Sequence, residues 1–262
     1  MKKFLKQWLG LAAVAAASTL ICSAQPASFS AQPIADAFVT PGADGSLSVS
    51  NFGAAGALAL AANGLPQGEF QSVLKFDLSG AANSFNAQFG VGEWTVQSVT
   101  LQLSASPHNN AIFNNVAAGQ FNVSLMQDNS WAEGTGTGGV PKSDGISYST
   151  LLGTFVNNST DQALGTFSFG GTTNGQNSYT LSLPSGLTSD VLSGNDLSLR
   201  LFAADSGVSY LFSSRSGNTS SRPEMLIDAV PVPEPGSLAL CLAAVGTLAL
   251  VRWFRNCAMR TG

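Results

Sequence analysis

Residues 99–103 read VTLQL, residues 121–125 read FNVSL, residues 179–183 read YTLSL and residues 197–201 read LSLRL. In each stretch apolar residues alternate with polar ones, which is the period of a strand with one buried and one exposed face. Gly, Asn, Ser and Asp gather between such stretches, as expected of turns. Weaker strand candidates are residues 35–39, 58–61, 73–78, 151–155, 166–169, 210–213 and 225–227. The pattern predicts an all-β fold, a jelly-roll-like antiparallel β-sandwich.

Helices are expected mainly at the two chain ends. Between them the sequence shows no amphipathic helical pattern, and only one helical turn is predicted, at residues 188–192, begun by Thr188 and ended by Gly194. We therefore expect a sandwich flanked by an N-terminal signal helix and a C-terminal hydrophobic helix.

Charge is distributed unevenly along the 262 residues. Residues 25–235 hold all fifteen acidic residues but only five cationic ones, so this part carries a net charge of −10, against −4 for the whole chain. A surface of that sign repels phosphate backbones and argues against nucleic acid as a partner. The cysteines, Cys22, Cys241 and Cys257, lie in or beside terminal apolar segments, so no disulfide is expected in the central part.

The N-terminal segment has the pattern of a secretory signal peptide. Three lysines precede an apolar run over residues 8–21, and small residues follow at positions 22–24. We expect the Sec translocon to export the chain and signal peptidase to cleave after Ala24. A lipoprotein signal would need a small residue before Cys22, where this chain has Ile21.

The C-terminal segment has a different pattern. Residues 232–235, Val232, Pro233, Glu234 and Pro235, precede an apolar run over residues 238–251, which ends at a cluster containing Arg252 and Arg255. At ~1.5 Å per residue this run spans about 21 Å, less than the ~30 Å hydrocarbon core of a membrane. We expect a weak, transient anchor in the inner membrane with a cytoplasmic C-terminus. The alternative is a buried core helix.

This terminal arrangement resembles the PEP-CTERM sorting signal of Gram-negative bacteria. The resemblance covers about 25 residues, from the Val-Pro-Glu-Pro motif to the arginine cluster. It implies recognition by an exosortase-type membrane transpeptidase that cleaves near the motif, often alongside exopolysaccharide production. The tail beyond the arginines, residues 256–262, is longer than usual for such signals.

The central part is similar to the DNRLRE domain, a jelly-roll module related to carbohydrate-binding modules. The similarity rests on an ordered series of short phrases: ADAFV at 35–39, NFG at 51–53, SVLKFDLS at 72–79, NSWAEGT at 129–135, FSSR at 212–215 and PEML at 223–226. It implies a secreted surface protein, and some members bind acidic glycans. The family commonly has Arg-Glu where this chain has Arg215-Ser216, and no catalytic module accompanies the domain.

The expected domain organisation follows from these segments. It comprises a signal peptide (1–24), a linker (25–33), the DNRLRE-like sandwich (34–228), a Pro-rich linker with the sorting motif (229–237), a sorting helix (238–255) and a tail (256–262).

Few residues suggest catalysis. His108 is the only histidine and lies in a Pro-His-Asn-Asn stretch, so a Ser-His-Asp triad would use it only by coincidence. With one histidine and no cysteine between the terminal segments, a zinc site lacks ligands. The glycine-rich residues 134–139 are not followed by a helical pattern and are predicted to form a flexible surface loop rather than a phosphate loop. Scattered acids leave a carboxylate pair open as an alternative. We expect no catalytic residues.

Binding candidates are more specific. Trp131 and Tyr148 flank the glycine-rich stretch and are candidate glycan contacts, with burial in the core as the alternative. Calcium is a candidate cofactor, with oxygen ligands drawn from acids near turns. These acids are Asp36, Asp44, Asp128, Asp144 and Asp205.

One structural contact is predicted as well. Arg215 lies in a segment poor in cations, and the first and last strands of a jelly roll often lie close together. We therefore expect a structural ion pair of Arg215 with Asp36 or Asp77.

Together these features predict an exported, non-enzymatic surface or extracellular-matrix protein, processed through an exosortase and associated with exopolysaccharide. The alternative is a calcium-assisted glycan-binding module. A polysaccharide lyase or hydrolase is the third hypothesis.

Overall fold

The structure is a computed structural model that describes residues 25–106, 113, 119–169, 175–232, 246, 247 and 252. Within it, residues Ala27–Ala229 form one compact unit. The fold and the sites described below belong to this unit.

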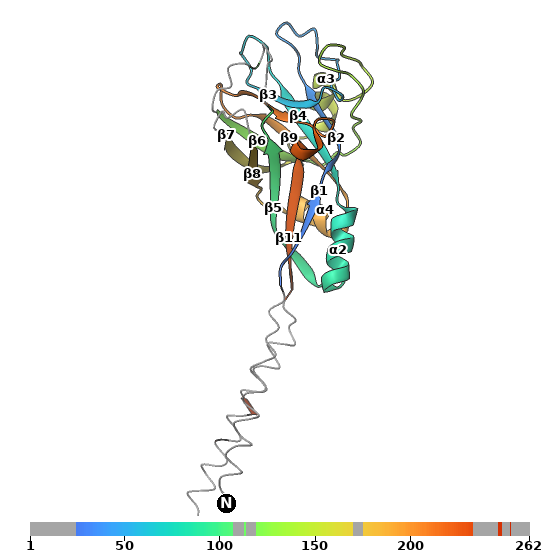
Figure 1. Cartoon of the computed structure of the whole chain (residues 1–262), viewed down its shortest axis with the longest axis vertical. Coiled ribbons are helices and arrows are strands. Elements are labelled where there is room, and N and C mark those ends of the chain that lie inside the picture. Colours follow the sequence, from blue (N-terminus) through green and yellow to red (C-terminus); the bar gives the residue numbers. More distant parts are fainter. Residues whose placement is uncertain are drawn as a thin grey trace, which may run out of the picture. The chain divides into compact units, whose positions relative to one another are not determined.

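The alternating stretches form two antiparallel sheets (Figure 1). One sheet has the strand order β1-β11-β5-β8, and the other has the order β2-β4-β9-β6-β7. A shorter pair, β10-β3, touches the end of β5 through a bridge between Phe212 and Ala105. The strands are β1 (Ala27–Ala31), β2 (Pro33–Val39), β3 (Ala57–Ala61), β4 (Gln71–Asp77), β5 (Trp94–Ser104), β6 (Gly119–Met126), β7 (Gln162–Phe169), β8 (Gln176–Thr180), β9 (Asp196–Ala203), β10 (Ser209–Ser213) and β11 (Glu224–Pro231). The prediction of an all-β antiparallel sandwich is confirmed.

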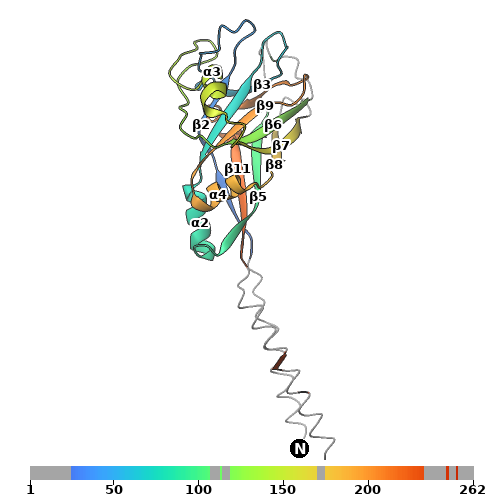
Figure 2. The same cartoon turned by 180° about the vertical axis from the view of Figure 1, so that it is seen from behind.

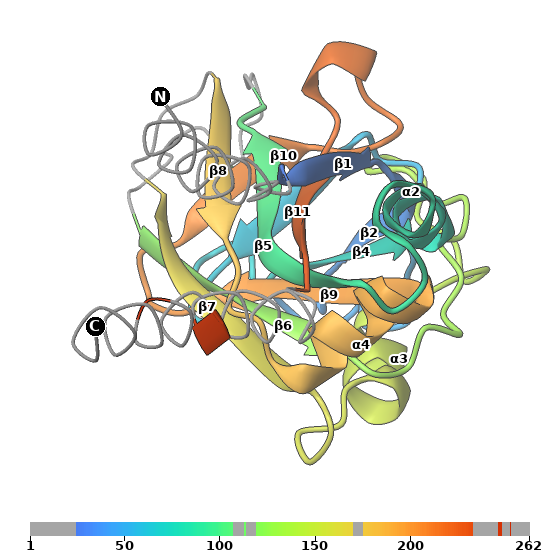
Figure 3. The ribbon, with the colours of Figure 1, turned by 90° about the horizontal axis from the view of Figure 1, so that it is seen from below.

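The core lies between the two sheets. In β5, Leu101 and Leu103 are fully buried while Gln102 between them is partly exposed, which is the alternation seen in the sequence. The strands of both sheets are seen from below in Figure 3. Inward side chains of both sheets join one apolar cluster. At its centre the ring of Phe121 meets Tyr179 edge-on at 5.0 Å and Tyr210 at 6.1 Å, measured between ring centroids. The core therefore depends on aromatic packing between the sheets.

Helix α2 (Ser79–Phe89) was not predicted from the sequence. It buries Ala81, Ala82 and Phe85, and the ring of Phe85 lies 4.9 Å from that of Trp94. The expectation of no amphipathic helix is therefore wrong. Tertiary packing against β1 and β5 stabilises this helix, in which two Asn, two Ser and one Gly offset the helix propensity of three Ala.

Helix α4 (Ser185–Ser193) corresponds to the predicted helical turn but begins earlier. Its N-cap is Pro184, so Thr188 lies inside the helix rather than capping it. Its end was predicted correctly, because Gly194 is the C-cap and adopts the left-handed φ of +67°. Helices α2 and α4 contact each other at one end of the sandwich (Figures 1 and 2).

Residues 151–155 are a π-helical turn, η1 (Leu151–Phe155), and not the predicted strand. Just before it, α3 (Tyr148–Thr150) begins with a capping box in which Ser147 and Thr150 bond each other's backbone N–H groups. This cap turns the chain into a helix before Leu151, the only residue of η1 that is fully buried. A single 3₁₀ turn, η2 (Thr219–Ser221), precedes β11.

The predicted linker at residues 25–33 is also wrong in its bounds. Residues Ala27–Ala31 form β1, which pairs with β11 in register Ala27 to Ala229. Their small and aromatic side chains pack against the core cluster. The folded unit thus begins about seven residues earlier than predicted, and β11 continues to Pro231, past the expected end at residue 228.

Candidate functional site

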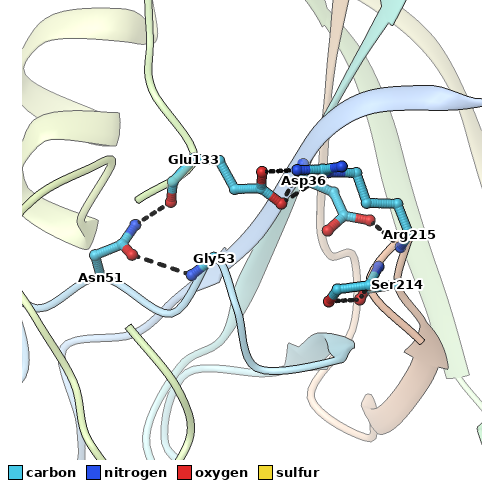
Figure 4. A network of polar contacts seen from close by, with 7 residues as sticks. Asp36, Asn51, Gly53, Glu133, Ser214 and Arg215 are labelled. Atoms are coloured by element: carbon cyan, nitrogen blue, oxygen red, sulfur yellow. Dashed lines mark hydrogen bonds and ion pairs between the residues drawn. The ribbon is translucent and has the colours of Figure 1, made fainter. Parts of the chain in front are cut away.

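Arg215 forms a charge network with two acidic residues from different parts of the chain (Figure 4). Its guanidinium donates to Glu133, with Nε 2.9 Å from Oε1 and a second bond to Oε2. Its backbone N–H donates to Oδ2 of Asp36 in β2 at 2.6 Å. The network therefore ties β2, the segment after β6 and the segment after β10 together.

The predicted ion pair with Asp36 or Asp77 is therefore wrong in its partner. Asp36 lies against the backbone of Arg215, so the long side chain extends past it and its guanidinium meets Glu133. Asp77 stands at the end of β4, where its carboxylate accepts the Ser79 N–H at 2.8 Å at the start of α2. Because α2 was not predicted from the sequence, this role of Asp77 was not predicted either.

Asp36 is the most perturbed acid of the network. Its side chain is fully buried, and Oδ1 has no hydrogen-bond partner among the described residues. Burial raises the pKa of Asp36 to about 7; the Arg215 N–H opposes this shift and the nearby charge of Glu133 adds to it. Asp36 therefore titrates near neutral pH, whereas an exposed aspartate would be ionised there.

Asn51 fixes the loops around this network, and the sequence analysis did not single out its side chain. Its amide Nδ2 donates to the carbonyls of Glu133 and Ile146, and its Oδ1 accepts the N–H groups of Gly53 and Gly136 (Figure 4 shows two of these bonds). Asn51 is completely buried. Four backbone groups thus depend on one side chain, and the phrase NFG at 51–53 was the only signal of it.

The glycine-rich stretch 134–139 is only partly the flexible loop that was predicted. Gly136 is buried, and a Cβ placed on it would lie 1.9 Å from the Asn51 carbonyl oxygen. Gly138 and Gly139 have nothing within 4 Å of an added Cβ. The first half of the stretch is therefore packed against Asn51, and the second half faces open space.

We expect Gly136→Ala to lower the free energy of unfolding by about 2–3 kcal/mol, because backbone must move to make room for the methyl group. Denaturant unfolding of the full-length chain would measure this. Gly138→Ala is the matched control and is expected to change stability by less than about 0.5 kcal/mol. Equal effects of the two substitutions would contradict the packing of Gly136.

Trp131 is a core residue, so its prediction as a glycan contact is wrong. Its side chain is 2% exposed, and its indole N–H donates to Ser198 Oγ at 2.9 Å. The ammonium of Lys75 lies 4.6 Å from the ring centroid and donates to the Trp131 carbonyl. The alternative of burial is therefore confirmed for Trp131.

Tyr148 is half-buried at the start of α3. Its hydroxyl donates to Glu69 Oε2 at 2.8 Å. Burial, and then the bond to Glu69, raise the pKa of Tyr148 to about 12. Its role as a glycan contact stays a prediction.

The acids considered as calcium ligands hold turns or backbone groups, and calcium stays a prediction. Asp44 and Asp128 each accept the N–H and hydroxyl of the serine two positions later. Asp144 accepts the N–H of Thr135, nine positions earlier, on Oδ1 and its hydroxyl on Oδ2. Asp205 accepts the N–H groups of Gln120 and Gly207. Over the part of the chain that the structure describes, no three His, Cys, Asp or Glu side chains are grouped to hold a metal ion.

A polar hollow of about 450 Å³ lies beside η1. Two segments form it, one following β6 and one connecting η1 to β7. Its lining residues are Gln127, Asp128, Asn129, Ser130, Thr154, Phe155, Asn157, Thr160 and Asp161. Its volume falls within the ~300–1,000 Å³ that is usual for small-molecule sites.

Asp161 connects the two walls of this hollow. Its Oδ1 accepts the Gln127 N–H at 3.1 Å and its Oδ2 accepts the Asn157 N–H at 3.0 Å. On the first wall, Asn129 donates to the Asp196 carbonyl at 2.8 Å. Hydrogen bonds from Ser130 hold the pKa of Asp128 below its usual value, so Asp128 is anionic at neutral pH. From the sequence, Asp128 was predicted only as a calcium ligand, and the hollow was not predicted.

Several predicted residues lie outside the described part of the chain. These are Ala24, His108, Pro233, Glu234, Pro235 and Arg255, whereas Val232 and Arg252 are described. Of the expected sorting helix only Gly246, Thr247 and Arg252 are described. In the described residues no helix is both long enough and apolar enough to cross a membrane.

Comparison with known proteins gives no family assignment. The chain matches no protein-family model, and no curated protein matches it either.

Proposed function

We propose that this chain is an exported, non-enzymatic surface or extracellular-matrix protein that is processed through a PEP-CTERM and exosortase system and associated with exopolysaccharide. The observation that carries the proposal is the pair of terminal segments: lysines and an apolar run before Ala24, and the Val-Pro-Glu-Pro motif, a short apolar run and arginines at the other end. The sandwich between them is the part that would be displayed.

In this proposal the chain passes through the Sec translocon and loses residues 1–24 to signal peptidase. The C-terminal segment holds it in the inner membrane until an exosortase-type transpeptidase acts near Pro235. The mature protein then reaches the cell surface or the extracellular space.

The sorting motif gives a direct test. Replacing Pro233 and Pro235 with alanine is expected to abolish C-terminal processing, so that mass spectrometry finds the full C-terminus in the membrane fraction. Pro231→Ala, which lies just outside the motif at the end of β11, is the control and should be processed normally. Normal processing of the double variant would contradict recognition of the motif.

A second candidate function is glycan binding, and the polar hollow beside η1 supports it. Amide and carboxylate groups in a hollow of this size suit the hydroxyl groups of a sugar. From the sequence, calcium is expected to assist such binding. Measuring binding to a glycan panel with calcium and with EDTA tests both parts of this proposal.

A further inference from the structure

The hollow beside η1 has walls that are fixed in advance. Asp161 bonds the backbone of both walls, through Gln127 and Asn157, and Asn129 bonds the first wall to β9. The protein would therefore lose little conformational entropy when a ligand binds there.

The hollow contains a carboxylate oxygen that makes no hydrogen bond within the described part of the protein. Asp128 uses only Oδ1 within the protein, for the Ser130 N–H and hydroxyl. The free Oδ2 of Asp128 calls for a ligand that donates hydrogen bonds, such as one rich in hydroxyl or ammonium groups.

Charge narrows the class of ligand further. None of the described residues that line the hollow is Lys, Arg or His, whereas Asp128 and Asp161 are acidic. Lys75 acts on Asp128 from a distance, but its ammonium donates to the Trp131 carbonyl. A carboxylate or sulfate on the ligand would therefore be repelled, and an ammonium group would be attracted.

The second wall supplies an apolar surface. Phe155, the last residue of η1, lines the hollow and packs partly against the core cluster of Trp131. An aromatic side chain beside carboxylates and amides can contact the C–H face of a sugar ring while the polar groups bind its hydroxyls. Single π-helical turns such as η1 occur frequently at functional sites.

We propose that this hollow binds a short stretch of a neutral or amino-substituted saccharide, with Asp128 accepting hydrogen bonds from its hydroxyl or ammonium groups. The inference rests on the second proposed function, glycan binding, and names its site and its ligand class. It differs from the acidic glycans that the family resemblance implies.

The test is calorimetry on the full-length chain in a detergent without a sugar headgroup, with EDTA present. The probes are hexamers of glucose, mannose, galactose, glucosamine and glucuronate. We expect at least one neutral or amino hexamer to bind, and the glucuronate hexamer to bind at least about tenfold more weakly. Asp128→Asn keeps the bond to Ser130 but removes the charged acceptor, so it should weaken binding about tenfold.

Asp44→Asn is the matched control. Asp44 makes the same contacts with Ser46 that Asp128 makes with Ser130, but it does not line the hollow. Its replacement should leave binding unchanged.

If both variants bind like the wild type, the hollow is not the site although glycan binding stands. Preference for glucuronate, or binding only when calcium is added, overturns the proposed ligand class. If none of the hexamers binds, both this inference and glycan binding are overturned. Export and C-terminal processing are not affected by that result, because the Pro233 and Pro235 variants test them separately.

Discussion

Replacing Asn51 with alanine is expected to lower the free energy of unfolding by about 4 kcal/mol or more. The substitution leaves four backbone groups without their partner: the carbonyls of Glu133 and Ile146 and the N–H groups of Gly53 and Gly136. A buried polar group without a partner costs about 1–3 kcal/mol. Denaturant unfolding of the full-length chain, followed by tryptophan fluorescence, would measure the loss.

Asn218→Ala is the control for this experiment. Asn218 is exposed, and its side chain bonds only Ser220, two positions further along. We expect its loss to cost about 0.5–1 kcal/mol. If Asn51→Ala cost no more than that, Asn51 would not be the residue that fixes these loops.

The stability of the protein is expected to fall as pH rises from about 4 to about 7, on account of Asp36. The pKa of Asp36 is about 7 in the folded chain and 3.8 as an ordinary aspartate, so between these values the folded state keeps a proton that the unfolded state has released. The stabilisation is complete below about pH 4 and is lost as pH passes through 7. One pKa unit corresponds to about 1.4 kcal/mol, so the loss is on the order of 4 kcal/mol.

Asp36→Asn should remove this pH dependence, because asparagine is neutral throughout and can still accept the Arg215 N–H. Unfolding curves between pH 4 and pH 8 would show the variant overtaking the wild type in stability as pH rises. Asp77→Asn is the control, since hydrogen bonds from Ser79 lower the pKa of the exposed Asp77 and place its titration below this range. Parallel curves for wild type and Asp36→Asn would contradict the perturbed pKa.

The strands were predictable because a strand with one buried face has an apolar residue at every second position. Leu197, Leu199 and Leu201 are all fully buried, as their spacing indicates. Helix α2 leaves no comparable mark, since its buried positions are mostly alanines and its remaining residues favour turns. Its stability comes from contacts with β1, α4 and β5, which no local pattern shows.

The candidate sites were harder to predict for the same reason. Arg215 was recognised as a structural cation, but its partner Glu133 is 82 residues away, and Asn51 bonds groups 82 and 95 residues away. Trp131 was a candidate glycan contact with burial as the alternative, and the groups that accommodate it in the interior, the hydroxyl of Ser198 and the ammonium of Lys75, are 67 and 56 residues away in the sequence. The hollow depends on two loops meeting, which requires the pairing of β6 with β7 to be known.

The position of β11 gives the domain unequal resistance to mechanical force at its two ends. Ala27 and Ala229 are paired, so the chain enters and leaves the domain through two neighbouring strands, β1 and β11. β11 lies between β1 and β5. A force applied along β11 from its C-terminal end is therefore resisted by two rows of hydrogen bonds at once, one to each neighbouring strand. A pull at Ala27 is resisted by one row, because β1 is an edge strand. A protein tethered through its C-terminal side would thus bear the force through β11, which is held more strongly than β1.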